Sequence, residues 1–438
     1  MKVMKFGGTS VGSPQRIKNV AELINGETGK KFVVLSAMSG TTNSLVEIYT
    51  ALKNGDKNQA VALTEALRKK YGSVIAQLFT DPDILDETVG TVNQIFNDIL
   101  DLCDEEYSEA LSKEIISKGE LISTNLLNNY YREQNIGVAF LPALDFMRKT
   151  ELDEPDFTYI KSALSGLMSL YPNADIFLTQ GFICRSSDGK VDNLQRGGSD
   201  YTASIIGAAL NADEIQIWTD IDGMHNNDPR FVDNTSPVHN LHFEEAAELA
   251  YFGAKILHPT CILPAKENNI PVRLLNTMEP KAEGTLIDHN LQKGEIQAVA
   301  AKDNITAIKI KSSRMLLAYG FLKKVFDVFD KYQTPIDMVT TSEVGVSVTI
   351  DDERHLKEIV EELSLLGTVS IDKDMVIICV VGDLDWQNVG FESKIIEAMD
   401  EIPVRMISYG GSNYNVSLLI RKEDKTKALK LLSPHLFQ

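Results

Sequence analysis

The chain has 438 residues, of which 43% are hydrophobic and 24% charged, a composition typical of a globular protein with two or three domains. Its formal net charge of −19 argues against a surface for nucleic acid or for an anionic membrane, either of which needs a basic stripe. No apolar run approaches the roughly 18 residues that span a bilayer, and the N-terminus leaves no room for the apolar region of a signal peptide.

The first dozen residues, MKVMKFGGTSVG, combine a short apolar strand, a glycine pair and the start of a helix. Gly7 and Gly8 let backbone N–H groups approach an anion without interference from a Cβ atom. Lys5 adds a full positive charge just before the turn. The segment therefore indicates a phosphate cradle, although the Walker A pattern is absent. A plain tight turn explains this stretch equally well when it is taken alone.

A second expected strand, residues 31–35, ends in the hydroxyl-rich loop SAMSGTTNS. Ligands bind at the carboxyl ends of strands in open α/β sheets, so this loop can hold a small polar ligand. An ordinary capped loop is the preferred interpretation of the loop alone. Residues 45–131 have a helical pattern that breaks near Asp81-Pro82-Asp83. Glu120 within them is either a substrate-facing carboxylate or a solvated helix residue.

The stretch LQRGGSDYT, residues 194–202, repeats this logic with a glycine pair, hydroxyls and then an apolar helix. Arg196 precedes the glycines and offers a planar fork that suits a carboxylate. Asp200 follows them, and a helix N-cap is an equally good interpretation of it.

Residues 214–218 form a further expected strand that runs into Thr219, Asp220 and a glycine turn. Arg230 follows some ten residues later, and the whole pattern fits the edge of a nucleotide site. His239 and His242 have no nearby third ligand, and such pairs are usually surface residues, so we expect no protein-bound metal. The four cysteines are widely spaced without a C-x-x-C pair, which favours reduced core thiols and a cytoplasmic location.

From residue 296 onward, short strands alternate with short helices and the pattern repeats. The segment PIDMVT at residues 335–340 matches PVRMIS at residues 403–408, and each copy has a helix before and after it. We therefore predict a duplicated βαββαβ unit. The second copy needs one more strand, which we expect near residues 296–310.

Four motifs in this order, together with the tandem repeats, resemble the signatures of the aspartate kinases. The motifs are KFGGTSV at 5–11, RGGSDYTA at 196–203, WTDIDG at 218–223 and FGAKILHP at 252–259. The repeats resemble the ACT regulatory domains of that family. The resemblance implies a three-layer α/β amino-acid-kinase domain over residues 1–295, a first ACT domain over 296–380 and a second over 381–438.

The activity that the resemblance implies is ATP-dependent phosphorylation of the β-carboxylate of L-aspartate to 4-phospho-L-aspartate. This is the first step of lysine, threonine and methionine synthesis. A carboxylate is already ionised at neutral pH, so catalysis needs no general base and consists of positioning and charge neutralisation. Mg²⁺ is expected mainly on the phosphates of ATP. We expect a monofunctional enzyme without a fused homoserine dehydrogenase.

The resemblance also implies residue roles. Lys5 would neutralise the transferring phosphoryl group, and Asp200 would orient the lysines or Mg²⁺. Arg196 would clamp the α-carboxylate of aspartate, and Glu120 would accept from its ammonium. The expected substrate-binding residues are Ser36, Thr42, Glu120, Arg196 and Gly198. The expected ATP-binding residues are Lys5, Gly7, Gly8, Thr219, Asp220, His225, Arg230 and Lys255, with the backbone of Gly7 and Gly8 supplying donors.

Two segments, residues 315–322 and 336–343, are similar to the effector loops of the lysine-inhibited class of the family. The expected L-lysine-binding residues are Met315, Gly320, Phe321, Leu322, Asp337, Thr341, Ser342 and Glu343. Asp337 would pair with the ligand ammonium, whereas a strand-edge charge is the preferred interpretation without the family. Ala318 departs from a frequent hydroxyl, and His225 departs from an aromatic residue that often packs on adenine.

Two other functions remain open. The kinase fold also serves other acceptors (glutamate, acetylglutamate, carbamate and UMP), and an inactive amino-acid sensor could be built on the same scaffold. Lys5, Arg196 and Asp200 are all present, which argues against an inactive sensor. ACT units pair their sheets edge to edge, so we expect a homodimer or a dimer of dimers.

Overall fold

Two large sheets organise the chain, which divides into two structural units. The computed structural model describes residues 1–437 except 195–196, 254–257, 313–314 and 316–318. The first unit comprises residues 1–223 and 257–289, and the second comprises residues 224–256 and 290–438.

Within the first unit, the strands of a mainly parallel sheet lie in the order β3-β4-β2-β1-β7-β9-β10. Only β10 runs antiparallel to its neighbour among these strands of the described chain. Strands β1, β2 and β4 are almost wholly buried, which explains their continuous apolar sequences. The bounds are β1 Lys2–Phe6, β2 Lys31–Leu35, β3 Ala139–Phe140, β4 Ile176–Gln180, β7 Glu214–Thr219, β9 Val272–Asn276 and β10 Thr285–Asp288. A separate hairpin joins β5 (Ile183–Arg185) to β6 (Val191–Asn193).

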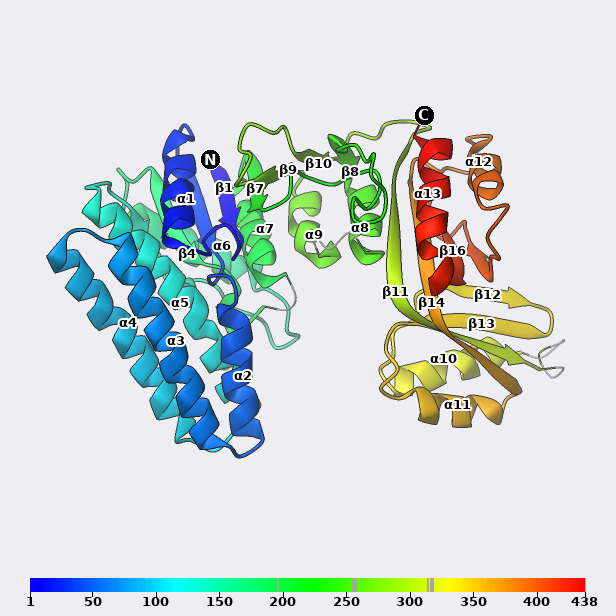
Figure 1. Ribbon diagram of the computed structural model, residues 1–438, viewed down its shortest axis with the longest axis horizontal. Coiled ribbons are helices and arrows are strands. Elements are labelled where there is room, and N and C mark those ends of the chain that lie inside the picture. Colours follow the sequence, from blue (N-terminus) through cyan, green and yellow to red (C-terminus); the bar gives the residue numbers. More distant parts are fainter. Residues whose placement is uncertain (195–196, 254–257, 313–314, 316–318, 438) are drawn as a thin grey trace. The chain divides into compact units, whose positions relative to one another are not determined.

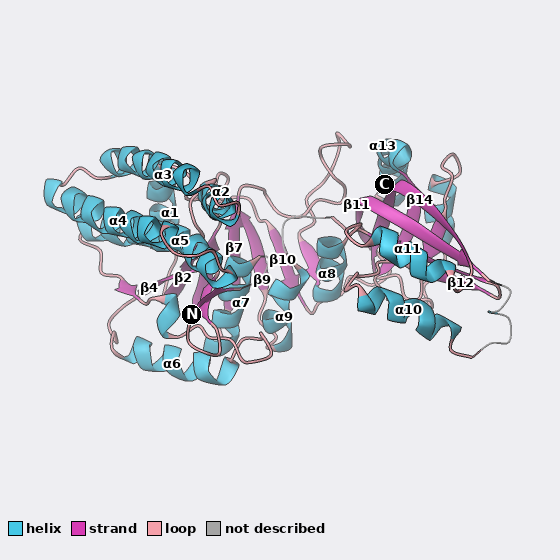
Figure 2. Ribbon diagram, turned by 90° about the horizontal axis from the view of Figure 1, so that it is seen from below, coloured by secondary structure: helices cyan, strands magenta, loops and turns pink. Residues whose placement is uncertain are grey.

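Helices cover both faces of this sheet, which gives the predicted three layers (Figure 2). One face carries α1 Pro14–Gly26, α2 Thr41–Lys53, α3 Lys57–Leu78, α4 Pro82–Cys103 and α5 Glu109–Glu133. The other face carries α6 Phe157–Ser169, α7 Gly198–Leu210 and α9 Pro259–Glu267. A short 3₁₀ turn, Ala143–Asp145, follows β3.

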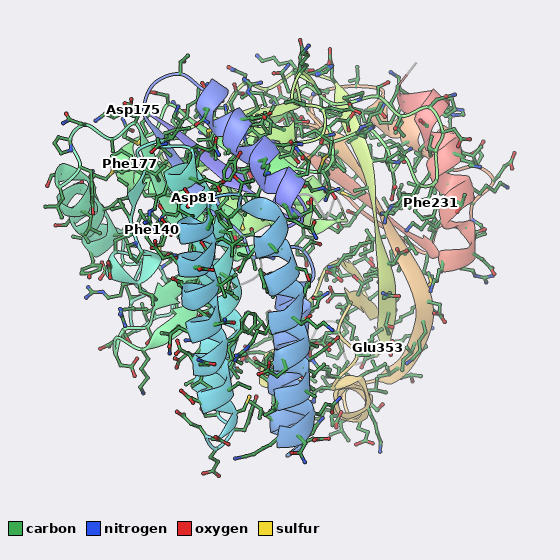
Figure 3. All side chains as sticks on the ribbon, turned by 60° about the vertical axis from the view of Figure 1, so that its left-hand side comes forward. Asp81, Phe140, Asp175, Phe177, Phe231 and Glu353 are labelled. Carbon is green, nitrogen blue, oxygen red and sulfur yellow. The ribbon has the colours of Figure 1, made fainter. Side chains whose placement is uncertain are left out.

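The break predicted within the long helical stretch is a helix start. The Asp81 side chain accepts hydrogen bonds from the N–H groups of Asp83 and Ile84 at 2.9 and 3.2 Å, and Pro82 occupies the first turn (Figure 3). An acidic N-cap followed by proline is a strong start signal, because both satisfy or remove backbone donors that a helix leaves unpaired.

The second unit is built on an antiparallel sheet in the order β12-β13-β11-β14-β16-β15. The strands are β11 Ile296–Lys311, β12 Val339–Ser342, β13 Gly345–Ile350, β14 Thr368–Gly382, β15 Met406–Ser408 and β16 Asn415–Arg421. The helices are α8 Phe243–Tyr251, α10 Phe321–Lys331, α11 Leu356–Ser364, α12 Phe391–Ala398 and α13 Lys425–Leu436, with β8 at Asn240–His242 and a 3₁₀ turn at Lys422–Asp424.

Strands β11 and β14 are long enough to serve both copies of the repeat. Residues 296–302 of β11 pair with residues 377–382 of β14, whereas residues 305–311 pair with residues 368–375. Helices α12 and α13 lie beside one end of these strands, and α10 and α11 beside the other (Figure 1). Each helix pair covers its own apolar core. Each half is therefore a βαββαβ unit.

The described residues contain no helix that is both long and apolar enough to cross a membrane.

Candidate functional site

The turn after β1 brings two loops of the first unit together. Ser39 donates its N–H to the carbonyl oxygen of Gly8 at 3.0 Å. A Cβ atom on Gly8 would lie only 2.7 Å from the carbonyl oxygen of Ala37, so glycine is needed for this close approach. The turn therefore fixes the loop after β2 against the loop after β1.

The sequence predicts that Gly7 and Gly8 each offer a backbone N–H donor to ATP, and the structure differs for Gly7. Gly7 already donates its N–H to the carbonyl oxygen of Trp218 at 3.1 Å. The N–H groups of Gly8 and Thr9 donate to no acceptor among the described residues. Gly8 and Thr9, rather than Gly7, offer the turn's free donors to an anion.

Lys5 and Asp200 form an ion pair directly beneath the turn. Lys5 Nζ lies 2.7 Å from Asp200 Oδ1, and the two side chains are only 10% and 13% exposed. The contact lacks hydrogen-bond alignment, because Asp200 Oδ1 is a buried atom without a hydrogen-bond partner in the described structure. A Cβ atom on Gly7 would lie 3.5 Å from the same Nζ. The ammonium thus stands at the mouth of the cradle.

The start of α7 explains the second glycine pair. Gly197 is the N-cap, with a φ of +73°, so the N-cap interpretation of Asp200 is wrong and its carboxylate stands in the first turn. A Cβ atom on Gly198 would lie 2.4 Å from Cδ2 of Phe182. Gly198 therefore has a packing reason to be glycine, and its predicted contact with substrate remains a prediction.

Glu120 lies in α5 and is 4% exposed, so the interpretation as a solvated helix residue is wrong. Its Oε1 accepts a hydrogen bond from the N–H of Ala37 at 3.2 Å, and its Oε2 has no partner among the described residues. Burial raises the pKa of the Glu120 carboxyl to about 8. A buried carboxyl with one unsatisfied oxygen is suited to receive a cation.

The other predicted aspartate-binding hydroxyls lie in the loop after β2 and at the start of α2. Ser36 is half-buried, and its carbonyl oxygen accepts a hydrogen bond from Ser123 Oγ at 2.9 Å. Thr42 is exposed in the first turn of α2. Ser36 and Glu120 are therefore both joined to the same short loop, since Ala37 follows Ser36 directly.

The predicted nucleotide residues fall into three groups. Thr219 ends β7 and Asp220 follows it in the first unit, and Thr219 Oγ1 donates to Asp220 Oδ1 at 3.1 Å. His225 and Arg230 belong to the second unit, where His225 Nδ1 lies 2.8 Å from Thr235 Oγ1. Arg230 is exposed and binds Asp228 with its guanidinium, Nη2 to Oδ2 at 2.6 Å. Lys255, like the predicted carboxylate clamp Arg196, lies outside the described residues.

Two hydroxyls near the cradle were not identified from the sequence. Ser10 Oγ and Thr277 Oγ1 are 3.2 Å apart, and Thr277 also donates to the carbonyl oxygen of Thr219 at 2.8 Å. Thr277 follows β9 directly. A hydroxyl at the carboxyl end of a parallel strand was the available signal.

The predicted effector carboxylate, Asp337, lies just before the edge strand β12, but its side chain is buried and paired. The Asp337 side chain is 1% exposed, and its Oδ1 accepts from Lys302 Nζ at 2.6 Å and from Tyr251 Oη at 2.7 Å. Burial raises the pKa of the Asp337 carboxyl, and the Lys302 ammonium opposes that shift.

The other predicted effector residues lie in or after β12 and near the start of α10. Asp337 precedes this strand, whereas Glu343 follows it. Gly320 is the N-cap of α10 with a φ of +77°, followed by the buried Phe321 and the partly exposed Leu322. Thr341, Ser342 and Glu343 are exposed, and Met315 is half-buried. Ala318 lies outside the described residues.

The chain matches two known families along its length. The amino acid kinase family matches residues 1–276, and an ACT domain family matches residues 378–436. Lysine-sensitive aspartokinase 3 of Escherichia coli is 31% identical over 450 aligned residues, which cover 100% of this chain and 99% of that protein. The chain belongs to the aspartokinase family.

Two crystal structures of aspartokinase III from Escherichia coli resemble this aspartokinase over 100% of both chains. The complex with aspartate and ADP has a TM-score of 0.84 at 30% identity. The complex with lysine and aspartate has a TM-score of 0.83 at 32% identity. These findings confirm the predicted family, fold class and enzyme class.

Proposed function

We propose that this aspartokinase transfers the γ-phosphoryl group of ATP to the β-carboxylate of L-aspartate and releases ADP and 4-phospho-L-aspartate. The observation that carries the residue assignment is the Lys5–Asp200 pair beneath the free N–H groups of Gly8 and Thr9. These groups lie at the carboxyl end of β1, where open parallel sheets bind ligands. The related complex with aspartate and ADP supports this assignment.

The reaction depends mainly on neutralising the negative charges of its two anionic substrates. A β-carboxylate oxygen attacks the γ-phosphorus, the bond from phosphorus to the bridging oxygen breaks, and ADP leaves with the electron pair. Lys5 would hold the negative oxygens of the transferring group while the N–H groups of Gly8 and Thr9 bind the adjacent phosphate. Because Asp200 meets Lys5 without hydrogen-bond alignment, the N–H bonds of Lys5 can turn toward the phosphoryl oxygens.

Mg²⁺ would neutralise charge on the phosphates when it is bound. The described residues contain no cluster of three metal-binding side chains. The proposed main ligands are the phosphates of ATP, because Mg²⁺ usually keeps several waters and few protein ligands. Asp200 is the carboxylate that fits a role toward the ion, since its Oδ1 lacks a hydrogen bond.

Glu120 would bind the ammonium of L-aspartate through its unpartnered Oε2. Its carboxyl is protonated in the free enzyme at neutral pH, since its pKa is raised to about 8, and an arriving ammonium favours the charged form. Ser36 and Thr42 would complete this pocket, and Arg196 would bind the α-carboxylate.

We further propose that L-lysine inhibits the enzyme at the first ACT unit, with Asp337 as the partner of a ligand ammonium. The burial of Asp337 and its unpartnered Oδ2 support this assignment, as does the related complex with lysine and aspartate. The edge strand β12 exposes Val339, Thr341 and Ser342, which supports edge-to-edge pairing of two chains in a homo-oligomer. The proposed location is the cytoplasm.

Aspartate-dependent ADP release with ATP and Mg²⁺ tests this function directly. We expect activity with L-aspartate that falls on addition of millimolar L-lysine. Activity with glutamate, acetylglutamate, carbamate or UMP instead would replace the substrate, and no activity with any acceptor would favour an inactive sensor. Activity that is indifferent to lysine would overturn the effector assignment alone.

A further inference from the structure

The carboxylate assigned to the effector already carries a lysine of the chain itself. Lys302 Nζ lies 2.6 Å from Asp337 Oδ1 and 3.0 Å from Asp351 Oδ2, and the Lys302 side chain is 16% exposed. The same ammonium lies 4.3 Å from the centre of the Tyr251 ring. Two carboxylates and an aromatic face are the partners that a free lysine ammonium would seek. Lys302 therefore occupies a site with the chemistry of an effector site.

The second copy of the repeat provides an internal comparison. Asp372 on β14 lies 70 residues after Lys302. The same offset relates the two copies elsewhere, because residue 308 pairs with residue 348 in the first copy and residue 378 pairs with residue 418 in the second. Arg405 occupies the position of Asp337 in the matched segment and donates from Nε to Asp372 Oδ2 at 2.8 Å. The charges are reversed, and this pair is 32% and 45% exposed. Both copies hold an ion pair here, but only the first buries it beneath an aromatic ring.

The Tyr251 ring belongs to a segment that leads, along the sequence, to the expected ATP-binding residue Lys255. Tyr251 ends α8, and Gly253 follows with a φ of +124°. A Cβ atom on Gly253 would lie 2.3 Å from the carbonyl oxygen of Ala301, so this turn is seated on β11 directly beside Lys302. Lys255, for which the family resemblance implies ATP binding, comes two residues later in the sequence.

We propose that Lys302 is an internal competitor of the effector. Its ammonium occupies Asp337 until free L-lysine displaces it, and Tyr251, which binds the same carboxylate oxygen, transmits the exchange to α8. This inference rests on the proposed effector site. An occupied form that outnumbers the open form ten to one weakens the apparent affinity for lysine about tenfold. Lys302 thereby sets the lysine concentration at which inhibition begins.

Isothermal titration calorimetry with L-lysine, together with inhibition of ADP release, tests the competition on the full-length enzyme. Lys302→Met keeps the length of the side chain and removes its charge, so lysine should bind about tenfold more tightly. Lys302→Arg strengthens the internal pair through a planar fork, so lysine should bind about threefold more weakly or worse. ADP release without lysine should not change in either variant. Arg405→Met breaks the reversed pair of the second copy and serves as the matched control, with unchanged lysine binding.

Lysine binding to folded Lys302→Met that is no tighter than in the wild type would overturn the competition. If that variant fails to fold, Lys302→Arg decides, because it retains the charge, and unchanged lysine binding would overturn the proposal. Asp337→Asn distinguishes the effector site itself from the competition by Lys302. Retained lysine binding in Asp337→Asn overturns the effector site itself, whereas lost binding together with unaffected Lys302 variants overturns only the competition.

Transmission through α8 has its own readout. Tyr251→Phe removes the hydroxyl that donates to Asp337 but keeps the ring above Lys302. Lysine should still bind to this variant in calorimetry, while the residual activity at saturating lysine should rise at least about threefold. Complete inhibition at saturating lysine would remove Tyr251 from the mechanism.

Discussion

The Lys5–Asp200 pair of the first unit and the Lys302–Asp337 pair of the second have nearly the same separation, but their surroundings differ. Lys5 and Asp200 lie 2.7 Å apart without hydrogen-bond alignment, beside backbone donors that have no acceptor. Lys302 and Asp337 lie 2.6 Å apart in an aligned hydrogen bond that Tyr251 reinforces. In the proposed function, the first arrangement lets the Lys5 ammonium turn to a new anion at each catalytic cycle. In the proposed competition, the second holds the Lys302 ammonium until a competing cation arrives.

The largest difference between the two pairs should appear in kcat when Lys5 is changed to Met. We expect kcat to fall by about 10³-fold or more, because the transferring group loses its nearest cation, whereas Lys302→Met should leave kcat unchanged. Steady-state ADP release at saturating substrates measures this. Lys149→Met is the matched control within the first unit, since Lys149 is 5% exposed and its Nζ lies 2.8 Å from Asp192. More than a tenth of wild-type kcat in Lys5→Met would contradict the assigned role.

The next effect should come from Glu120→Gln, which keeps the shape of the side chain and removes its charge. We expect KM for aspartate to rise roughly ten- to hundredfold, because a charge-assisted hydrogen bond is worth about 1.5–3 kcal/mol. Glu245→Gln is the control, since Glu245 in α8 is also buried and has a pKa raised to about 7. An unchanged KM for aspartate in Glu120→Gln would move the ammonium site elsewhere.

A smaller effect should appear in the pH dependence of stability. The Glu120 pKa is raised from its ordinary 4.5 to about 8 in the folded protein, so the folded state binds more protons than the unfolded state between these values. This contribution to the free energy of unfolding is complete below pH 4.5 and is lost as the pH rises through 8. Urea unfolding between pH 5 and 9 should therefore show a shallower decline in Glu120→Gln. Parallel curves for the two proteins would rule out the raised pKa.

The smallest effect should come from Arg405→Met, which breaks the exposed counterpart of the Lys302–Asp337 pair. We expect the free energy of unfolding to fall by less than about 1 kcal/mol, because solvent screens exposed pairs. Lys302→Met should cost more, because it leaves a buried carboxylate without its cation. Urea titrations of the two variants measure the difference. Equal losses of the free energy of unfolding would show that burying the Lys302–Asp337 pair does not change its contribution to stability.

The sequence predicted those parts of the fold that local patterns encode. The strands expected in the first dozen residues, at residues 31–35 and at residues 214–218 are β1, β2 and β7, whose residues are mostly buried. The break expected near Asp81 and Pro82 is the start of α4, which the chemistry of one turn determines. These features depend on neighbours in the chain, which a single sequence displays.

The site was predictable only in part, because its contacts join distant segments. Helical periodicity could not decide whether Glu120 faces solvent or the loop after β2. The role of Lys302 was missed, since Tyr251 and Asp337 reach it from segments 51 and 35 residues away. A charged residue interrupting the apolar run AVAAKDN was the available signal. Only the pairing of β11 with its neighbours gives that charge its partners.

The pairing of β11 with β14 makes the first ACT-type copy an insertion within the second. Residues 305–375 contain every strand of the first copy, whereas the second draws its strands from residues 296–302 and from the chain after residue 375. The first copy can therefore fold during synthesis before the strand partners of residues 296–302 in the second copy have been made. Its folding then brings the two separated parts of the second copy together and removes the cost of closing a loop of some seventy residues. A substitution that unfolds the first copy should thus unfold the second as well, although the reverse does not follow.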